Sequence, residues 1–384
     1  MRNRKRRKSI PADARLVLRS AASRLLWQVG LVVMILALPA TGQDGASQIR
    51  AEAERLQHSL RDKPISYPDN PNASTMVGDG LKEVIQGQSA GRLYISLEKL
   101  CQTTDFLHAV WAVADKAEAV KPGLPAYEAE WEKVSSSVTA IDRQAREKNW
   151  NDSRVAVRAL SETAQSMTIP LLEGARGFAV SRQPKDGLFN LGQAQGQAEF
   201  AVFCTTLHFP RKGTAYPLRS LMPEIETLQE KTNAAFQPPR SIDLHTLFMS
   251  LNSALKQARE LDATKCYAGA LYQYLYSVGY YGMLDAAPLD SSQQSALKSA
   301  LVAARQKLDA SQRDDSIAEL FLEKAESQVA HVDGSAASAD DWRIAKVIID
   351  QVLPAYFALD KPLAAAHRAS GKTIDITLVR WPYT

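Results

Sequence analysis

The sequence has little cysteine and little histidine for its length. Three cysteines and six histidines stand among 384 residues, which excludes a small scaffold held together by disulfides. No Cys-x-x-Cys-His motif occurs, so covalent attachment of a c-type haem is excluded. The nearest pair with metal-ligand spacing on a helix is Asp105 with His108, and it occurs once. We therefore expect no metal site and no cofactor.

A strongly apolar run of membrane-spanning length is also missing. The most apolar stretch, residues 25–40, has 16 residues, fewer than the roughly 20 that cross a bilayer. It follows a basic segment and precedes the small residues Ala40 and Gly42, which is the order of a secretory signal cleaved before Gln43. We expect residues 1–42 to export the protein to the periplasm or the medium. The alternative is an uncleaved inner-membrane anchor formed by residues 25–40.

The remainder of the chain lacks a basic excess. The whole chain carries a formal net charge of +4, but nine of its 46 basic residues and one of its 42 acidic residues lie in the first 24 positions. The rest is mildly acidic, with a net charge of −4. Such a body does not attract polyanions, so we expect no nucleic-acid binding. With 45% hydrophobic residues it is also too apolar for a disordered chain.

What the body does contain is apolar residues at intervals of three and four, as in Leu93, Leu97, Leu100 and Leu107. Each such stripe gives a helix one apolar face that another helix must cover. Clusters of proline and glycine separate about nine or ten predicted helices from one another. These clusters lie at 64–72, 122–125, 183–187, 210–223, 238–239 and 333–338. Residues of the helix-capping type stand before three of the periodic runs, at 151–153, 290–292 and 338–341.

These patterns predict an all-α body over residues 43–371, arranged as an antiparallel helical bundle or as stacked helical hairpins. The tail differs. In residues 372–384, Ile374, Ile376 and Leu378 alternate with polar residues, which predicts one short C-terminal β segment. A lone strand must pair with something. Its partner is an internal segment, such as 213–218 or 63–67, or the sheet edge of a partner protein.

Two predicted helices carry almost no charge. Residues 266–284 contain six tyrosines and no charged residue, and Tyr272, Tyr276 and Tyr280 share one face. Six phenols make this a poor lipid-facing helix, so we expect it to be buried in protein. In the other helix, residues 187–208, Glu199 is the only full charge, and the spacing of Gly192 and Gly196 predicts close approach of a neighbouring helix.

If these two helices pack together, they form a pocket for a small polar ligand; its lining would be Tyr272, Tyr276, Tyr280, Gln193, Gln197 and Glu199. The alternative is that the phenols and amides satisfy one another inside the core. The three cysteines are typical of small core residues, although Cys204 and Cys266 would join the two helices if they formed a disulfide.

Three catalytic patterns are incomplete. Ser89 lies in a Gly-x-Ser-x-Gly sequence that lacks the strand a nucleophile elbow requires. Residues 366–373 resemble a phosphate-binding loop with the order of helix and strand reversed. Ser253 and Ser295 each precede a lysine by three residues, without the other motifs of penicillin-recognising enzymes.

Without a complete catalytic constellation, we expect an exported, non-enzymatic protein that binds a partner or a small ligand in a bacterial cell envelope. The competing hypothesis is an exported enzyme whose site lies in the pocket between the two uncharged helices.

Overall fold

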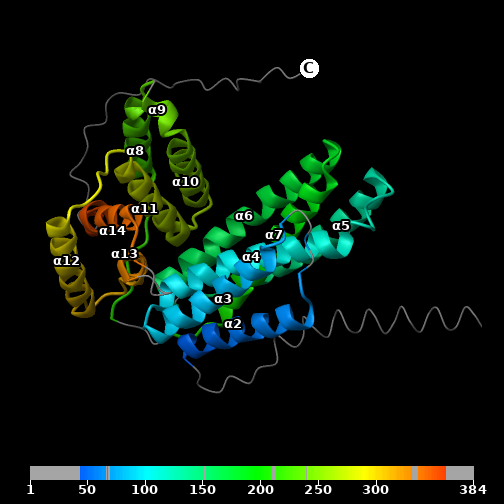
Figure 1. Cartoon of the computed structure of the whole chain (residues 1–384), viewed down its shortest axis with the longest axis horizontal. Helices are drawn as coiled ribbons and strands as arrows, with labels where there is room; N and C mark the ends of the chain where they lie inside the picture. Colours follow the sequence, from blue (N-terminus) through cyan, green and yellow to red (C-terminus); the bar gives the residue numbers. More distant parts are fainter. Residues whose placement is uncertain are drawn as a thin grey trace, which may run out of the picture. The chain divides into compact units, whose positions relative to one another are not determined.

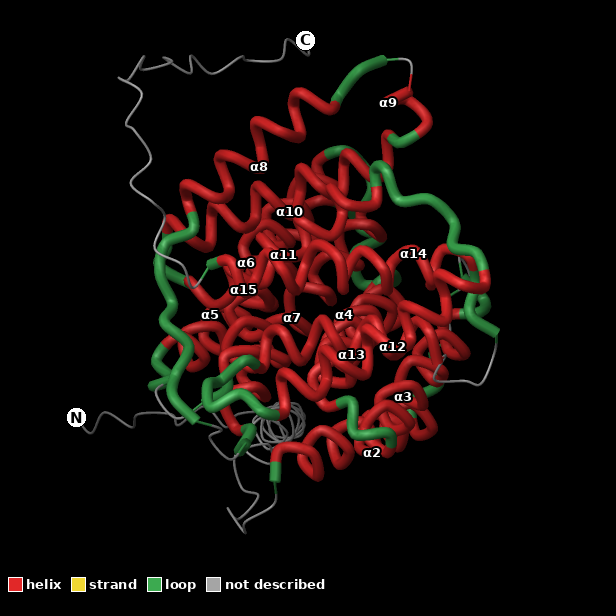
Figure 2. The backbone as a smooth tube through the Cα atoms, turned by 90° about the vertical axis from the view of Figure 1, so that its left-hand side faces the viewer, coloured by secondary structure: helices red, strands yellow, loops and turns green. Residues whose placement is uncertain are grey.

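The computed structural model describes the chain at residues 44–65, 67, 70–150, 153–209, 213–238, 240–330 and 336–359. The predicted export signal at 1–42, the phosphate-loop-like segment at 366–373 and the predicted strand at 372–384 lie outside these residues. The described residues are almost entirely helical (Figure 2), so the all-α prediction is confirmed for this part of the chain. Its sheet structure consists of one isolated bridge, between Thr214 and Arg313.

The helices follow the apolar stripes of the sequence and alternate with loops (Figure 1). They are α2 (Gly45–Asp62), α3 (Ala73–Ser89), α4 (Leu93–Lys116), α5 (Leu124–Arg146), α6 (Val155–Val180), α7 (Pro184–Thr206), α8 (Met222–Ala235), α9 (Arg240–Asp243), α10 (His245–Ala263), α11 (Tyr267–Met283), α12 (Ser291–Asp309), α13 (Ser316–Ala330), α14 (Ala339–Val347), the π-helical turn η1 (Ile348–Val352) and α15 (Leu353–Ala358).

The predicted breaks separate these helices, with one shift. α7 begins at Pro184, inside the break predicted at 183–187. Proline fits the first helical turn because the N–H group that it lacks has no partner there. Asp290 and Ser338 each form a capping box at the start of a helix, as their sequence context predicts.

Neighbouring helices along the chain pack against each other, α3 against α4, α6 against α7, and α10 against α11. The helices α2 to α7 lie together in Figure 1, and the helices from α8 onward gather beside them. α6 joins the two groups, because it contacts α5 and α7 and also α10, α11 and α13. The tyrosine-rich α11 packs against α10, α6, α8, α14 and η1, as expected for a helix with aromatic residues on several sides.

Several helices begin against a side chain from a distant part of the chain. At the start of α4, Tyr94 N and Ile95 N donate to Glu323 Oε2 at 2.7 and 2.9 Å. At the start of α11, Gly269 N donates to Glu162 Oε2 at 2.8 Å. These carboxyl groups satisfy N–H groups that have no partner within their own helix.

The start of α6 also uses acceptors from a distant part of the chain. Residues 151 and 152 of the predicted cap lie outside the described residues, and the residue before the helix, Arg154, makes no side-chain cap bond. Val155 N donates to Asp314 Oδ2 and Ala156 N to Ser316 Oγ, both at 2.9 Å. Because these acceptors lie about 160 residues further along the chain, only the tertiary fold brings them to this helix.

α7 lies very close to α4, as its two glycines predicted. A Cβ atom at Gly192 would lie 2.6 Å from Ala109 Cα, and one at Gly196 would lie 2.8 Å from Asp105 Cα. Real Cβ atoms do not approach backbone atoms so closely, so only glycine permits this separation of the helices.

Candidate functional site

Three tyrosines of α11 form a ladder of rings. Tyr272, Tyr276 and Tyr280 follow at intervals of four residues and therefore share one face of the helix. The ring centroids are 4.9 Å apart for the first pair and 6.0 Å apart for the second. Phe321 of α13 packs beside the first two rings, with centroid distances of 6.0 and 5.3 Å. The contact with α13 therefore holds the rings of Tyr272 and Tyr276.

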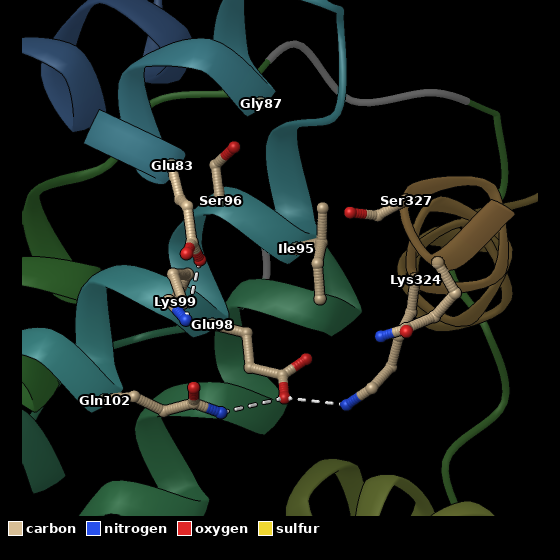
Figure 3. Close-up of a pocket in the computed structure, with 10 residues that line it drawn as sticks. Glu83, Gly87, Ile95, Ser96, Glu98, Lys99, Gln102, Lys324 and Ser327 are labelled. Carbon is tan, nitrogen blue, oxygen red and sulfur yellow. Dashed lines mark hydrogen bonds and ion pairs between the residues drawn. The ribbon is translucent and has the colours of Figure 1, made fainter. Parts of the chain in front are cut away.

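Glu98 of α4, Tyr276 of α11 and Lys324 of α13 meet at this ladder; we call them the Glu98 triad. Lys324 Nζ donates to Glu98 Oε1 at 3.1 Å and also to the phenol oxygen of Tyr276. The phenol donates in turn to Glu98 Oε1. Gln102 Nε2 donates to the same oxygen at 3.3 Å. Figure 3 shows Glu98, Gln102 and Lys324 converging.

The Glu98 triad is a partly buried ion pair, with the Lys324 side chain 22% exposed, and a neutral phenol lies beside it. Burial alone would lower the pKa of Lys324, but Glu98 and Tyr276 outweigh this and raise the pKa above its usual value. Burial, together with the negative charge of Glu98, raises the pKa of the Tyr276 phenol. The ammonium also lies 4.4 Å from the centroid of the Tyr276 ring, a cation–π geometry. Lys324 is therefore charged and Tyr276 neutral at neutral pH.

The second carboxyl oxygen of Glu98 differs from the first. Glu98 is 4% exposed, and its Oε2 atom has no hydrogen-bond partner among the described residues. A buried acceptor without a donor costs about 1–3 kcal/mol, and most buried polar atoms of native proteins are paired. This oxygen therefore marks a place where the protein's own side chains leave hydrogen-bonding capacity unused.

Two cavities meet at Glu98 and Gln102. The larger one, about 510 Å³ in volume, is open to solvent and lies between α4, α10 and α11. The tyrosine ladder forms one wall, and α10 forms another with Thr246, Met249, Ser250, Ser253 and Gln257. The smaller one, about 200 Å³, lies between α3, α4 and α13 and includes Lys324. Glu98 thus lines both cavities.

The other three residues predicted for the pocket lie elsewhere, against a later part of α4. Gln193 Nε2 donates to Asp105 Oδ2 at 3.1 Å. The Sγ atom of Cys101 lies 3.7 Å from Gln197 Oε1. α7 has α6, α4 and α5 as its main neighbours, so the structure places three of the six predicted residues near Glu98 and the other three near Cys101, Asp105 and His108, further along α4.

Glu199 is held in its charged form by several neighbours. His108 Nε2 lies 3.2 Å from Glu199 Oε2, and Gln195 Nε2 donates to Oε1 at 2.8 Å. Burial would raise the pKa of Glu199, but His108, Gln195 and the charge of Arg55 outweigh burial and lower it to about 2.

Asp105 of α4 accepts from Gln193, and at this carboxyl group the effect of burial dominates. Burial raises the pKa of Asp105 to about 6, although hydrogen bonds from Gln193 and Gln197 and the charge of His108 act in the opposite direction. The carboxyl groups of Asp105 and Glu199 therefore have pKa values shifted in opposite directions.

Sequence reasoning missed Glu98, Gln102 and Lys324. One signal was present: Glu98, Gln102 and Asp105 form a polar row at helical spacing beside the apolar stripe of α4. Lys324 carries no such signal, because its pairing with Glu98 joins residues 226 positions apart.

The three serines of the incomplete catalytic patterns lie within helices. Ser89 is the last residue of α3 and donates to Ile85 O at 3.0 Å, so a helix precedes it where a nucleophile elbow has a strand. Ser253 lies in α10, and the side chain of the following Lys256 is 77% exposed. Ser295 lies in α12.

The cysteines are all free thiols, so no disulfide joins Cys204 of α7 to Cys266. Among the described residues, no three His, Cys, Asp or Glu side chains gather as metal ligands would.

None of the helices in the described part of the chain combines the length and the apolar character that crossing a bilayer requires. In comparisons with known proteins, no family model, no curated protein and no solved structure matches the chain.

Proposed function

We propose that this protein is an exported, non-enzymatic binding protein that holds a small polar ligand in the larger cavity, over Tyr272, Tyr276 and Tyr280. The observation that carries the proposal is the buried Oε2 atom of Glu98, which lacks a partner among the described residues and belongs to a residue lining both cavities. A ligand N–H or O–H group that donates to this oxygen recovers its hydrogen bond.

The Glu98 triad supports binding because it is organised in advance. Three different helices supply Glu98, Tyr276 and Lys324, and every polar atom of the triad other than Glu98 Oε2 is engaged within it. A site fixed in this way loses little side-chain freedom when a ligand arrives, which favours affinity.

The competing proposal is an exported enzyme. It needs a group that exchanges protons near neutral pH, and the raised pKa values of Tyr276 and Lys324 suit neither of them to the role of a general base. The version with Gln193 and Glu199 in the same pocket also loses support, since Glu199 pairs with His108.

The rest of the proposal concerns parts of the chain outside the described residues and the finer architecture. Residues 1–42 act as the export signal, with an uncleaved anchor at residues 25–40 as the alternative. The body is a stack of helical hairpins, supported by the packing of α3 on α4, α6 on α7 and α10 on α11. Residues 372–384 form a strand that pairs internally or with a partner protein.

Native mass spectrometry of the protein purified from its host tests the binding function. We expect a bound small molecule that Ser253→Trp displaces, because Ser253 lines the larger cavity without touching the partly buried ion pair. Lys256→Trp, one turn away and pointing into solvent, should retain the ligand. If the wild-type protein carries no small molecule and its Tm does not change in an extract of host metabolites, the proposal is wrong.

A further inference from the structure

We propose that the ligand is neutral and rich in hydroxyl groups, of the chemical class of mono- and disaccharides. This inference rests on the proposed function, because it assigns a ligand class to the same cavity. It follows from three properties of the cavity wall: its charge balance, its hydrogen-bonding groups and its aromatic surface.

The charge balance excludes a ligand with a strong net charge. Among the residues that line the larger cavity, Glu98 is the one with a full charge, and Lys324 already neutralises it at 3.1 Å. A charged ligand would find no counterion in the wall that is not already paired, so it would lose part of its hydration without gaining an ion pair. The cavity therefore suits a neutral molecule.

The hydrogen-bonding groups call for a ligand that both donates and accepts. Thr246, Ser250 and Ser253 present hydroxyl groups from α10, and Gln102 and Gln273 present amides from α4 and α11. Hydroxyls and primary amides each offer both functions. Glu98 Oε2 accepts only, and an O–H group that donates to a carboxylate makes a strong, charge-assisted bond. A polyhydroxyl ligand provides donors and acceptors on all sides.

The aromatic wall suits the C–H face of a sugar ring. The tyrosine ladder presents three phenol rings along one side of the cavity. Met249, which is 58% exposed, adds a further apolar surface from α10. A saccharide has this mixed character, with hydroxyl groups around its edge and C–H groups across its faces. The volume of about 510 Å³ falls within the range of roughly 300–1,000 Å³ typical of small-molecule sites.

Titration calorimetry and thermal shift on the full protein purified from its host provide the test. The probes are glucose, galactose, mannose, maltose, sucrose and trehalose, with choline as a cation and citrate as an anion. We expect at least one sugar to bind and raise the Tm, and choline and citrate to do neither. Glu98→Gln should weaken sugar binding at least about tenfold, because the ligand loses a bond to a charged acceptor.

Two further variants separate a defect in binding from a defect in folding. Ser253→Trp should abolish sugar binding, and Lys256→Trp should leave it unchanged, since only the first side chain lines the cavity. If choline or citrate binds in place of the sugars, and Ser253→Trp abolishes that binding, the ligand class is wrong while the proposed function stands. If no probe binds and native mass spectrometry finds no small molecule on the protein, both are wrong.

Discussion

Glu323 is a carboxyl group whose position fixes its charge state. It is 3% exposed and accepts hydrogen bonds from the first N–H groups of α4. Burial raises the pKa of Glu323 to about 8, although the N–H groups of Ile95 and Tyr94 and the charge of Arg305 act in the opposite direction. Between its ordinary value of 4.5 and about 8, the folded protein holds a proton that the unfolded chain has released.

This proton makes stability fall as the pH rises through that interval, by up to about 1.4 kcal/mol per pH unit. Glu323→Gln keeps an oxygen that accepts the two N–H bonds and removes the titration. We expect the variant to lose less stability than the wild type between pH 4.5 and pH 8. Denaturant unfolding at a series of pH values measures the difference. Equal slopes for the two proteins over this interval would contradict the assigned protonation.

Glu199 makes stability change with pH in the opposite direction to Glu323, because the pKa of Glu199 is lowered to about 2 from an ordinary 4.5. On acidification, this carboxyl group takes up its proton at a higher pH in the unfolded chain than in the folded protein. The pairing with His108 therefore stabilises the protein above pH 4.5. This contribution disappears as the pH falls towards 2. Glu199→Gln should be less stable than the wild type at pH 6 and should lose less stability on acidification. Unfolding measured from pH 6 to pH 3 tests this, with the exposed Glu226→Gln on α8 as the control.

At the scale of the helices, the sequence predicts what is encoded locally. Asp290 and Ser338 start their helices through residues three positions away, so the pattern in the sequence is sufficient. The starts of α4 and α6 were beyond sequence reasoning, because Glu323 and Asp314 reach them from 229 and 159 residues away. Such bonds exist only after the fold has formed.

In the candidate site, too, features within one helix are predictable from the sequence, whereas contacts between helices are not. The ladder of Tyr272, Tyr276 and Tyr280 follows from spacing on one helix, so the sequence is sufficient to predict it. Pairing of this ladder with Glu98 and Lys324 depends on how three separate helices pack. A single sequence does not reveal which polar residue of another helix lies opposite the tyrosine ladder. For that reason the sequence predicts Glu199 in this pocket, although Glu199 does not line it.

The close contact of α7 with α4 permits a sharp test of packing. Alanine is a better helix former than glycine by about 1 kcal/mol, but a Cβ atom at Gly192 would collide with the backbone of His108 and Ala109. Gly192→Ala should therefore lower the free energy of unfolding by about 1–3 kcal/mol, the usual cost of overpacking. Denaturant unfolding measures this.

Gly78→Ala on α3 is the matched control, because a Cβ atom there would meet nothing within 4 Å. This variant should be unchanged or more stable by up to about 1 kcal/mol. If both alanine variants gain stability, α7 and α4 are not in close contact.

At the scale of the whole molecule, charge separates the chain into a basic start and an acidic body. The helical unit begins immediately after the predicted cleavage site, because Asp44 caps α2 by accepting from Ser47 N at 2.9 Å. Gly45 N also donates to His208 O at 2.5 Å, which fixes the start of α2 to the segment after α7. Cleavage before Gln43 therefore leaves the cap and this contact intact.

We expect the protein recovered from its host to begin at Gln43 and to leave the cytoplasm, which intact-mass measurement of the fractionated cells determines. A version produced without residues 1–42 should unfold at the same Tm as the exported protein. A version without residues 1–44 should lose about 1 kcal/mol, because it lacks the Asp44 cap. A protein that keeps all 384 residues and sediments with the membranes would instead identify residues 25–40 as an anchor, and the +4 of the full chain would then belong to the mature protein.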